Sequence, residues 1–229
     1  MDSMKRFAIY YAPPAGGLSD FGAAWLGWDP ATGSTVAHPD VAGLPRPVAE
    51  LTGTPRKYGF HGTLKPPFRL AQGQTADALA DACAALASRI APFDLQGLRL
   101  ARLGGFLALV PEGDAAPLAA LAAACVRDLD PFRAPPTGSE IARRAPDRLS
   151  PRQRELLDRW GYPYVMEEFR FHLTLSGKLD PQDAAAVEAA LAPVVAPLLP
   201  RPFPIGEICL FGEDGAGMFH ILRRFALRA

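Results

Sequence analysis

The chain has 229 residues, which is enough for one large domain or two small ones. Lys plus Arg balance Asp plus Glu at 24 each, so the sequence lacks the basic excess with which proteins hold long duplex nucleic acid. Three isolated cysteines form no CxxC pair, which argues against a zinc knuckle or a disulfide scaffold. No apolar run approaches the ~20 residues of a membrane span and no signal peptide is apparent, so we expect a cytoplasmic protein without membrane contact.

The elements predicted in chain order fall into two similar halves. After a strand at 5–11, the stretch 12–57 is rich in Gly and Pro and is expected to loop over the surface. Apolar-rich runs, helical periodicity and glycine-marked hairpins then predict a strand, a helix and a two-stranded hairpin, and later the same three elements again. The first set is 58–65, 75–90 and 94–111 with its turn at Gly104-Gly105, and the second is 168–176, a helix opened by Asp180, and a hairpin over 203–227.

A helix at 115–129 and a connection at 131–165 lie between the two sets. The connection carries seven arginines and one predicted helix with Ser150 as its N-cap. Two copies of one unit favour a single bilobal α+β domain with a central groove. We place lobe one at 1–130 and lobe two at 166–229, with an exchange of strands between the lobes left open.

Two of the four histidines begin the same pattern, one in each half. His61-Gly62-Thr63-Leu64 and His172-Leu173-Thr174-Leu175 both lie in the strand that precedes the helix. Because side chains alternate along a strand, His and Thr of each motif should share one polar face, with Lys65 or Arg170 beside them. The opposite face of each strand is apolar.

Two facing imidazoles suit acid–base chemistry near neutral pH, since one can accept a proton while the other donates one. The two Thr hydroxyls can donate hydrogen bonds to phosphate oxygens, and the cations can stabilise developing negative charge. No carboxylate cluster accompanies the histidines, so no metal and no other cofactor is expected. The alternatives are an ordinary solvated strand face or a metal held by His61 and His172.

The paired His-x-Thr motifs resemble the 2H phosphoesterase superfamily, which includes the LigT-type RNA ligases and cyclic phosphodiesterases. The stretches KYGFHGTLKPPF and WGYPYVMEEFRFHLTLSG look like the branch labelled putative phosphonate metabolism proteins. The resemblance covers nearly the whole chain. It implies a bilobal, pseudo-two-fold fold in which two antiparallel sheets form a central groove with helices outside, and metal-independent phosphoester chemistry by His61, Thr63, His172 and Thr174.

Further residues are candidates for substrate binding. Lys65 and Arg170 share the predicted catalytic face, and solvated charge is their alternative role. Tyr10 and Tyr11 lie on the first strand, where one of them could line the groove; we assign Tyr11 to substrate binding, with packing in the core as the alternative. Arg143, in the connection, would hold a second phosphate if that segment folds over the groove.

The sequence therefore predicts hydrolysis of a small cyclic phosphate or phosphodiester, with a ribosyl 1,2-cyclic phosphate suggested by the phosphonate resemblance alone. Two alternatives stay open. One is RNA end processing, as a 2′,3′-cyclic phosphodiesterase or a 2′–5′ ligase acting on a short RNA end. The other is a phosphate-ligand binding module without turnover.

Overall fold

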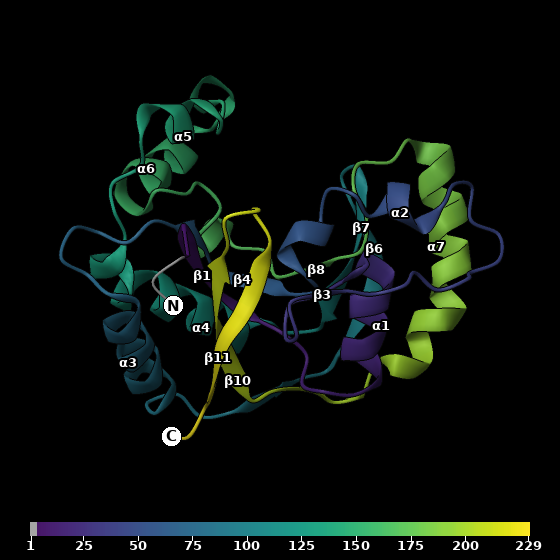
Figure 1. Cartoon of the computed structure of the whole chain (residues 1–229), viewed down its shortest axis with the longest axis horizontal. Helices are drawn as coiled ribbons and strands as arrows, with labels where there is room; N and C mark the ends of the chain where they lie inside the picture. The colour runs from purple at the N-terminus through teal and green to yellow at the C-terminus, as the bar shows by residue number, and fades with distance from the viewer. Residues whose placement is uncertain (1–3) are drawn as a thin grey trace.

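The computed structural model describes residues 4–229, and its centre is an antiparallel sheet (Figure 1). Within these residues the sheet has seven strands in the order β11-β10-β1-β4-β8-β7-β6. Its strands are β1 (Arg6–Tyr11), β4 (Gly62–Phe68), β6 (Gly97–Leu103), β7 (Phe106–Glu112), β8 (Leu173–Thr174), β10 (Glu207–Glu213) and β11 (Phe219–Ala226). Two small ribbons pair β2 (Trp28–Asp29) with β3 (Ser34–Thr35) and β5 (Phe93–Leu95) with β9 (Phe203–Ile205).

Each half of the sheet combines strands from both sequence repeats. The β6–β7 hairpin belongs to the first repeat but pairs with β8 of the second. The β10–β11 hairpin belongs to the second repeat but pairs through β10 with β1. The two halves meet at a single residue pair between β4 and β8, Gly62 with Leu173. The α+β class with antiparallel strands is confirmed, and the two expected sheets are the halves of one continuous sheet.

Seven α-helices lie within residues 4–229, and several of them pack on the sheet. They are α1 (Gly17–Leu26), α2 (Val48–Leu51), α3 (Ala76–Ala87), α4 (Ala116–Asp128), α5 (Gly138–Ala142), α6 (Pro151–Trp160) and α7 (Pro181–Val195). The predicted N-caps form as expected: Asp180 accepts from the backbone of α7, and Ser150 forms a capping box with Gln153 at the start of α6. The helix α4 packs on β4, and α7 packs on β6 and β7.

The expectation that 12–57 only loops over the surface is wrong. This stretch contains α1 and α2, and α1 places Trp25 and Leu26 in the core with no exposed surface. The indole Nε1 of Trp25 donates to the carbonyl of Leu175, at 2.6 Å, which ties α1 to the strand β8. Glycine and proline on both sides of α1 mask its apolar periodicity in the sequence.

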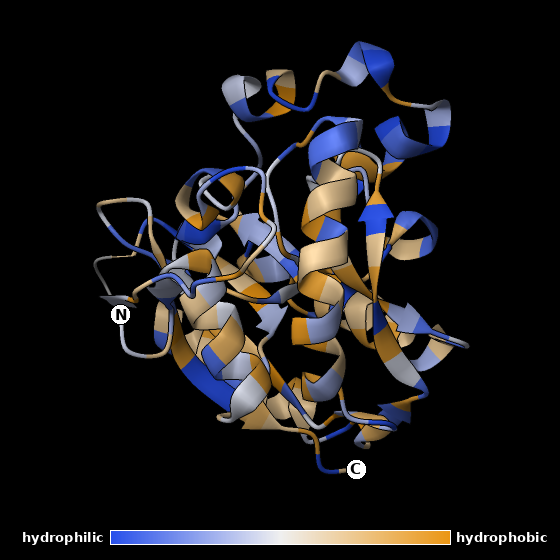
Figure 2. Ribbon diagram, turned by 90° about the vertical axis from the view of Figure 1, so that its right-hand side faces the viewer, coloured by the Kyte–Doolittle hydropathy of each residue, from blue (hydrophilic) through white to orange (hydrophobic). Residues whose placement is uncertain are grey.

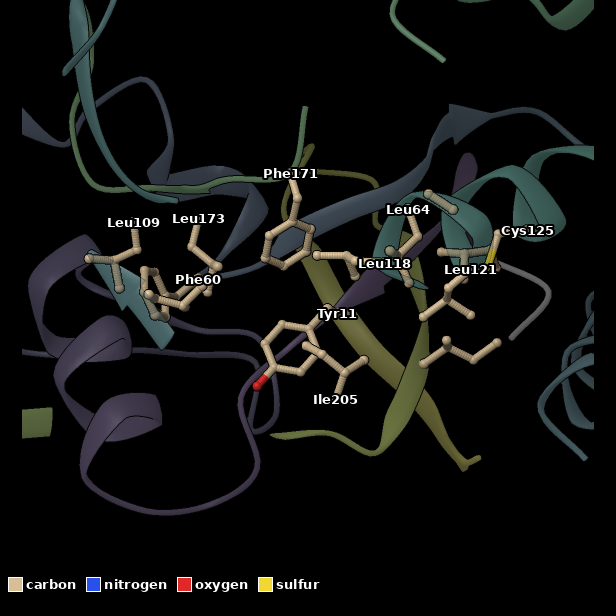
Figure 3. Packing of buried hydrophobic residues seen from close by; sticks show 14 of the residues in the cluster. Tyr11, Phe60, Leu64, Leu109, Leu118, Leu121, Cys125, Phe171, Leu173 and Ile205 are labelled. Atoms are coloured by element: carbon tan, nitrogen blue, oxygen red, sulfur yellow. The ribbon is translucent and has the colours of Figure 1, made fainter. Parts of the chain in front are cut away.

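One large apolar core lies between the sheet and the helices, and Figure 3 shows part of it. Leu64 of β4 packs there against Leu118 and Leu121 of α4, while Phe60, Phe171 and Leu173 lie beneath the junction of the two halves. The connection with α5 and α6 stands apart from this core at the top of Figures 1 and 2, and most of it is hydrophilic in Figure 2. Among residues 4–229, no helix combines the length and apolar character needed to cross a bilayer.

Candidate active site

The two His-x-Thr motifs lie side by side where the halves of the sheet meet. Strands β4 and β8 are antiparallel, and Gly62 pairs with Leu173. In each motif the histidine and the threonine flank this paired residue, one on either side of it. The four side chains line one cavity of about 380 Å³. The two motifs therefore face one shared space.

Close packing explains the glycines around the first motif. A Cβ atom at Gly62 would lie 2.3 Å from the ring of Phe171, so only glycine lets this ring fill the core beneath the motifs. Gly59 has φ 69°, in the left-handed region, and a Cβ there would lie 2.6 Å from Pro30. This backbone turn directs the Gly59 carbonyl toward His61.

Both imidazoles are held in the same way. Nδ1 of His61 is 2.9 Å from the carbonyl oxygen of Gly59, and Nδ1 of His172 is 2.8 Å from the carbonyl oxygen of Arg170. Because a carbonyl only accepts, each Nδ1 carries the hydrogen, and Nε2 of the neutral ring keeps a free lone pair. The Thr63 hydroxyl is 3.3 Å from Nε2 of His61 and can donate to it.

Burial sets the protonation state of His61. Its ring stacks on Tyr10 with centroids 3.8 Å apart, and the desolvation lowers its pKa to about 4. The nearby His172 lowers this pKa further, while the hydrogen bond to Gly59 opposes the shift. At neutral pH His61 is therefore an uncharged ring whose Nε2 is a proton acceptor.

The walls of the cavity combine cations and aromatic rings. The cations are Arg6, Arg144 and Arg170, and the aromatic side chains are Tyr10, Tyr58, Tyr162, Tyr164 and Phe169. On the other side of His61, a second and more apolar cavity of about 380 Å³ is lined by Phe106 and shares Tyr58, His61 and Thr174 with the first. A small molecule held at the two motifs therefore meets charge on one side and apolar surface on the other.

Two of the predicted binding arginines lie on the surface near the motifs. Arg170 is exposed and lines the cavity, and its Nη1 donates to the carbonyls of Glu167 and Phe169 at 2.9 and 2.7 Å. Its own carbonyl holds His172. Arg143 is also exposed but does not line the cavity of the histidines; it lines a neighbouring cavity instead.

Lys65 does not share the face of His61, which corrects the prediction from strand alternation. Its side chain is only 2% exposed, and Nζ donates to the carbonyl of Val126 at 3.0 Å and forms an ion pair with Asp130 at 3.2 Å. Burial lowers its pKa to about 8, and the Asp130 carboxylate opposes that shift. Lys65 therefore fastens β4 to the end of α4.

A bulge in β4 explains why the Lys65 side chain points away from the face of His61. Tyr10 of β1 pairs with Thr63, but the next residue back, Ile9, pairs with Lys65 rather than with Leu64. The extra residue shifts the register by one, so Leu64 and Lys65 both turn toward α4. The alternation of side chains between the two faces of β4 therefore holds only as far as Thr63.

Tyr11 faces the core, so its assignment to substrate binding is also wrong. It is 2% exposed and lies in the cluster of Figure 3, with its ring edge-on to Phe171 and Phe203. The neighbouring Tyr10 takes the cavity side, where it stacks on His61. Tyr10 pairs with Thr63, and directly paired residues share a face, so knowledge of that pairing would have identified Tyr10.

Other cavity residues had no usable signal in the sequence. Arg6, Tyr58 and Glu168 reach the cavity from β1 and from two short 3₁₀ turns. No period or motif marks such positions. Within residues 4–229, no three His, Cys, Asp or Glu side chains are grouped so that they could hold a metal ion.

Residues 63–220 match the family model described as "Protein of unknown function (DUF1045)". The chain belongs to this family. DUF1045 is part of the 2H phosphoesterase group, which confirms the resemblance found in the two motifs.

The curated relatives include two proteins named ribose 1,5-bisphosphate phosphokinase PhnN. The one from Janthinobacterium sp. (strain Marseille) is 36% identical over 222 residues, and the one from Laribacter hongkongensis (strain HLHK9) is 39% identical over 215 residues. The matches cover 94% and 93% of this chain but 49% of each relative. The chain thus spans about half the length of the curated relatives it matches.

Similar solved structures include a phosphoesterase, 19% identical with a TM-score of 0.43, covering 98% of this chain and 99% of that one. E. coli LigT complexed with phosphate is 17% identical, with a TM-score of 0.43 and 99% coverage of both chains.

Proposed function

We propose that the chain is a metal-independent phosphoesterase that hydrolyses a small cyclic phosphate by acid–base catalysis with two histidines. The observation that carries this proposal is the paired geometry of His61 and His172 in one cavity. A backbone carbonyl holds Nδ1 of each ring, so each Nε2 is the atom left for the substrate. A phosphate between them also comes within reach of Thr63 and Thr174.

We propose different roles for the two rings, because burial keeps the ring of His61 uncharged. Nε2 of the uncharged His61 accepts a proton from a water molecule that attacks phosphorus in line. The bond from phosphorus to the opposite ester oxygen breaks, and Nε2–H of a protonated His172 gives its proton to that leaving oxygen. One water is consumed and the cyclic diester becomes a phosphomonoester with a neighbouring hydroxyl. The threonine hydroxyls donate to the non-bridging oxygens throughout.

We propose a ribosyl 1,2-cyclic phosphate as the substrate type. Opening the bond to the 2-oxygen leaves a phosphate on C1 of ribose, and both curated relatives are named for ribose 1,5-bisphosphate. The balanced charge of the chain supports a small substrate rather than long RNA.

Hydrolysis of a panel of cyclic phosphates in the presence of EDTA tests the proposal. The panel contains ribosyl 1,2-cyclic phosphates, nucleoside 2′,3′-cyclic phosphates and RNA with a 2′,3′-cyclic end, and phosphorus NMR identifies each product. We expect turnover of the ribosyl compounds, and a loss of about 10²–10⁴-fold in His61→Ala and in His172→Ala with the fold retained. His38→Gln, a histidine that lines neither cavity at the motifs, is the matched control.

Preference for the RNA end would replace the proposed substrate class with RNA end processing. Tight binding of these ligands without any turnover would leave a phosphate-binding module and refute the enzymatic proposal.

A further inference from the structure

A third cavity, of about 200 Å³, adjoins the cavity of the two histidines on the side of the connection. The two cavities share Arg6, Tyr58, Pro67 and Arg144, so these residues lie at the boundary between them. At roughly 30 Å³ per water, this space has room for about six or seven waters, which is ample for one phosphate group.

The walls of this third cavity are strongly cationic. One carboxylate, Glu140, lies among them, and it is already engaged because it accepts from Arg69 and from the backbone of Thr137. The hydrogen bond from Arg69 is the main reason that the pKa of Glu140 falls to about 2. The six cationic residues of the lining are Arg6, Lys57, Arg69, Arg133, Arg143 and Arg144.

Carboxylates hold some of these cations in place. Arg133 forms a two-pronged ion pair with Asp130, at 2.8 and 3.1 Å, and Arg6 forms one with Glu213. Pairing of this kind fixes a guanidinium in position and leaves its outer N–H groups for a ligand.

The other cations have no anionic partner. Across residues 4–229, no carboxylate lies within ion-pair distance of Lys57, Arg143 or Arg144. Arg144 instead lies 4.5 Å above the ring of Tyr162, and Lys57 lies 4.9 Å from the ring of Tyr58. Like charges gathered around one cavity repel one another, and an anion in the cavity removes that cost.

We propose that this cavity binds a second phosphate group, so that the substrate carries two phosphates: the reacting ester at the histidines and a terminal monoester about one sugar ring away. The inference rests on the proposed function for the identity of the first group. Arg6 and Arg144 border both cavities and contact both ends of such a substrate. The terminal group is a phosphate dianion, because its two charges offset more of the unpaired cationic charge of the lining than a single carboxylate does.

Matched pairs of ligands test the second site. The reacting pair is ribosyl 1,2-cyclic phosphate with and without a 5-phosphate, compared by kcat/KM. The non-reacting pair is ribose 1,5-bisphosphate and ribose 1-phosphate, compared by Kd from calorimetry. We expect the additional phosphate to improve each constant by about tenfold or more, as one charge-assisted contact does.

Two variants test whether the preference for the additional phosphate arises at the third cavity. The double variant Lys57→Gln/Arg143→Gln should lose most of the preference for the additional phosphate. Arg148→Gln removes a charge from the same connection but lines neither cavity, and it should keep the full preference. An equal loss in both variants means that the attraction is diffuse, and it overturns the proposal of a site.

The two proposals fail in different ways. Turnover of the cyclic phosphates with equal kcat/KM and equal Kd within each pair refutes the second phosphate site and leaves the phosphoesterase. A preference in Kd without turnover of either cyclic compound refutes the phosphoesterase and supports the anion site.

Discussion

The low pKa of His61 makes the stability of the fold depend on pH in a way that can be calculated. The native state holds this ring unprotonated down to about pH 4, whereas an imidazole in the unfolded chain takes up its proton near pH 6.5. Between these values the unfolded state binds more protons than the native state. The contribution of His61 is therefore complete above about pH 6.5 and is lost as the pH falls toward 4.

The magnitude follows from the two pKa values. Over the whole interval the shift corresponds to about 3 kcal/mol, and between about pH 7.5 and about pH 5 it amounts to about 2 kcal/mol. His61→Phe removes the titrating group but keeps an aromatic ring on Tyr10. Urea unfolding at the two pH values should therefore show that the wild type loses about 2 kcal/mol more than the variant does.

Two results would refute this reasoning. If the wild type and His61→Phe lose the same free energy of unfolding on acidification, His61 is not the group responsible. If NMR titration of the native protein gives the His61 ring an ordinary imidazole pKa, the ring is better hydrated than its stacking on Tyr10 indicates.

Three further predictions concern the site and its support. Lys65→Ala should lower the free energy of unfolding by about 3 kcal/mol, measured in urea, while kcat of the folded variant stays near the wild-type value, because Lys65 holds α4 rather than substrate. In the wild type, the acidic limb of the kcat/KM profile should lie below pH 6, since that limb reports His61 in the free enzyme. Turnover should be the same in EDTA and in added Mg²⁺, and a requirement for the metal would contradict acid–base catalysis by the two histidines alone.

Local chemistry in the sequence predicts much of this fold. Side-chain caps identified the starts of α6 and α7, and the glycine-marked hairpins formed where expected. The repeat of His-x-Thr at matching positions brought four distant side chains to one cavity, although the strands that carry them are short. The caps and the turns work as signals because each depends on neighbours within a few residues.

The errors arise where non-local pairing overrides the local pattern. The direction of Lys65 depends on a bulge against β1, which the residues of β4 alone do not encode. The assignment of Tyr11 rather than Tyr10 to the cavity failed because both faces of β1 are buried, so polarity does not distinguish them. Cavity residues from the connection, such as Arg144, depend on how that segment folds back over β4.

The pairing of the sheet also explains why two near-identical motifs have different environments. Strand β1 lies beside β4 as β7 lies beside β8, and the residues that pair with the two threonines are Tyr10 with Thr63 and Ala108 with Thr174. The ring of Tyr10 therefore stacks closely on His61, with centroids 3.8 Å apart, while His172 has a tilted ring, Phe106, at 5.5 Å. Because burial is the main cause of the low pKa of His61, we expect the close cover by Tyr10 to favour His61 as the proton acceptor of the proposed mechanism.

Tyr10→Val should weaken that separation. Loss of the ring hydrates His61, so its pKa should rise from about 4 toward the ordinary value near 6.5, and the acidic limb of kcat/KM should rise with it. Tyr10→Phe keeps the stacked ring and is the matched control, in which the limb should stay in place. The folded fraction of each variant is measured first, because truncation of a buried ring costs about 3–5 kcal/mol. An acidic limb that does not move in a folded Tyr10→Val protein would mean that the difference between the two histidines has another origin than the aromatic cover on β1.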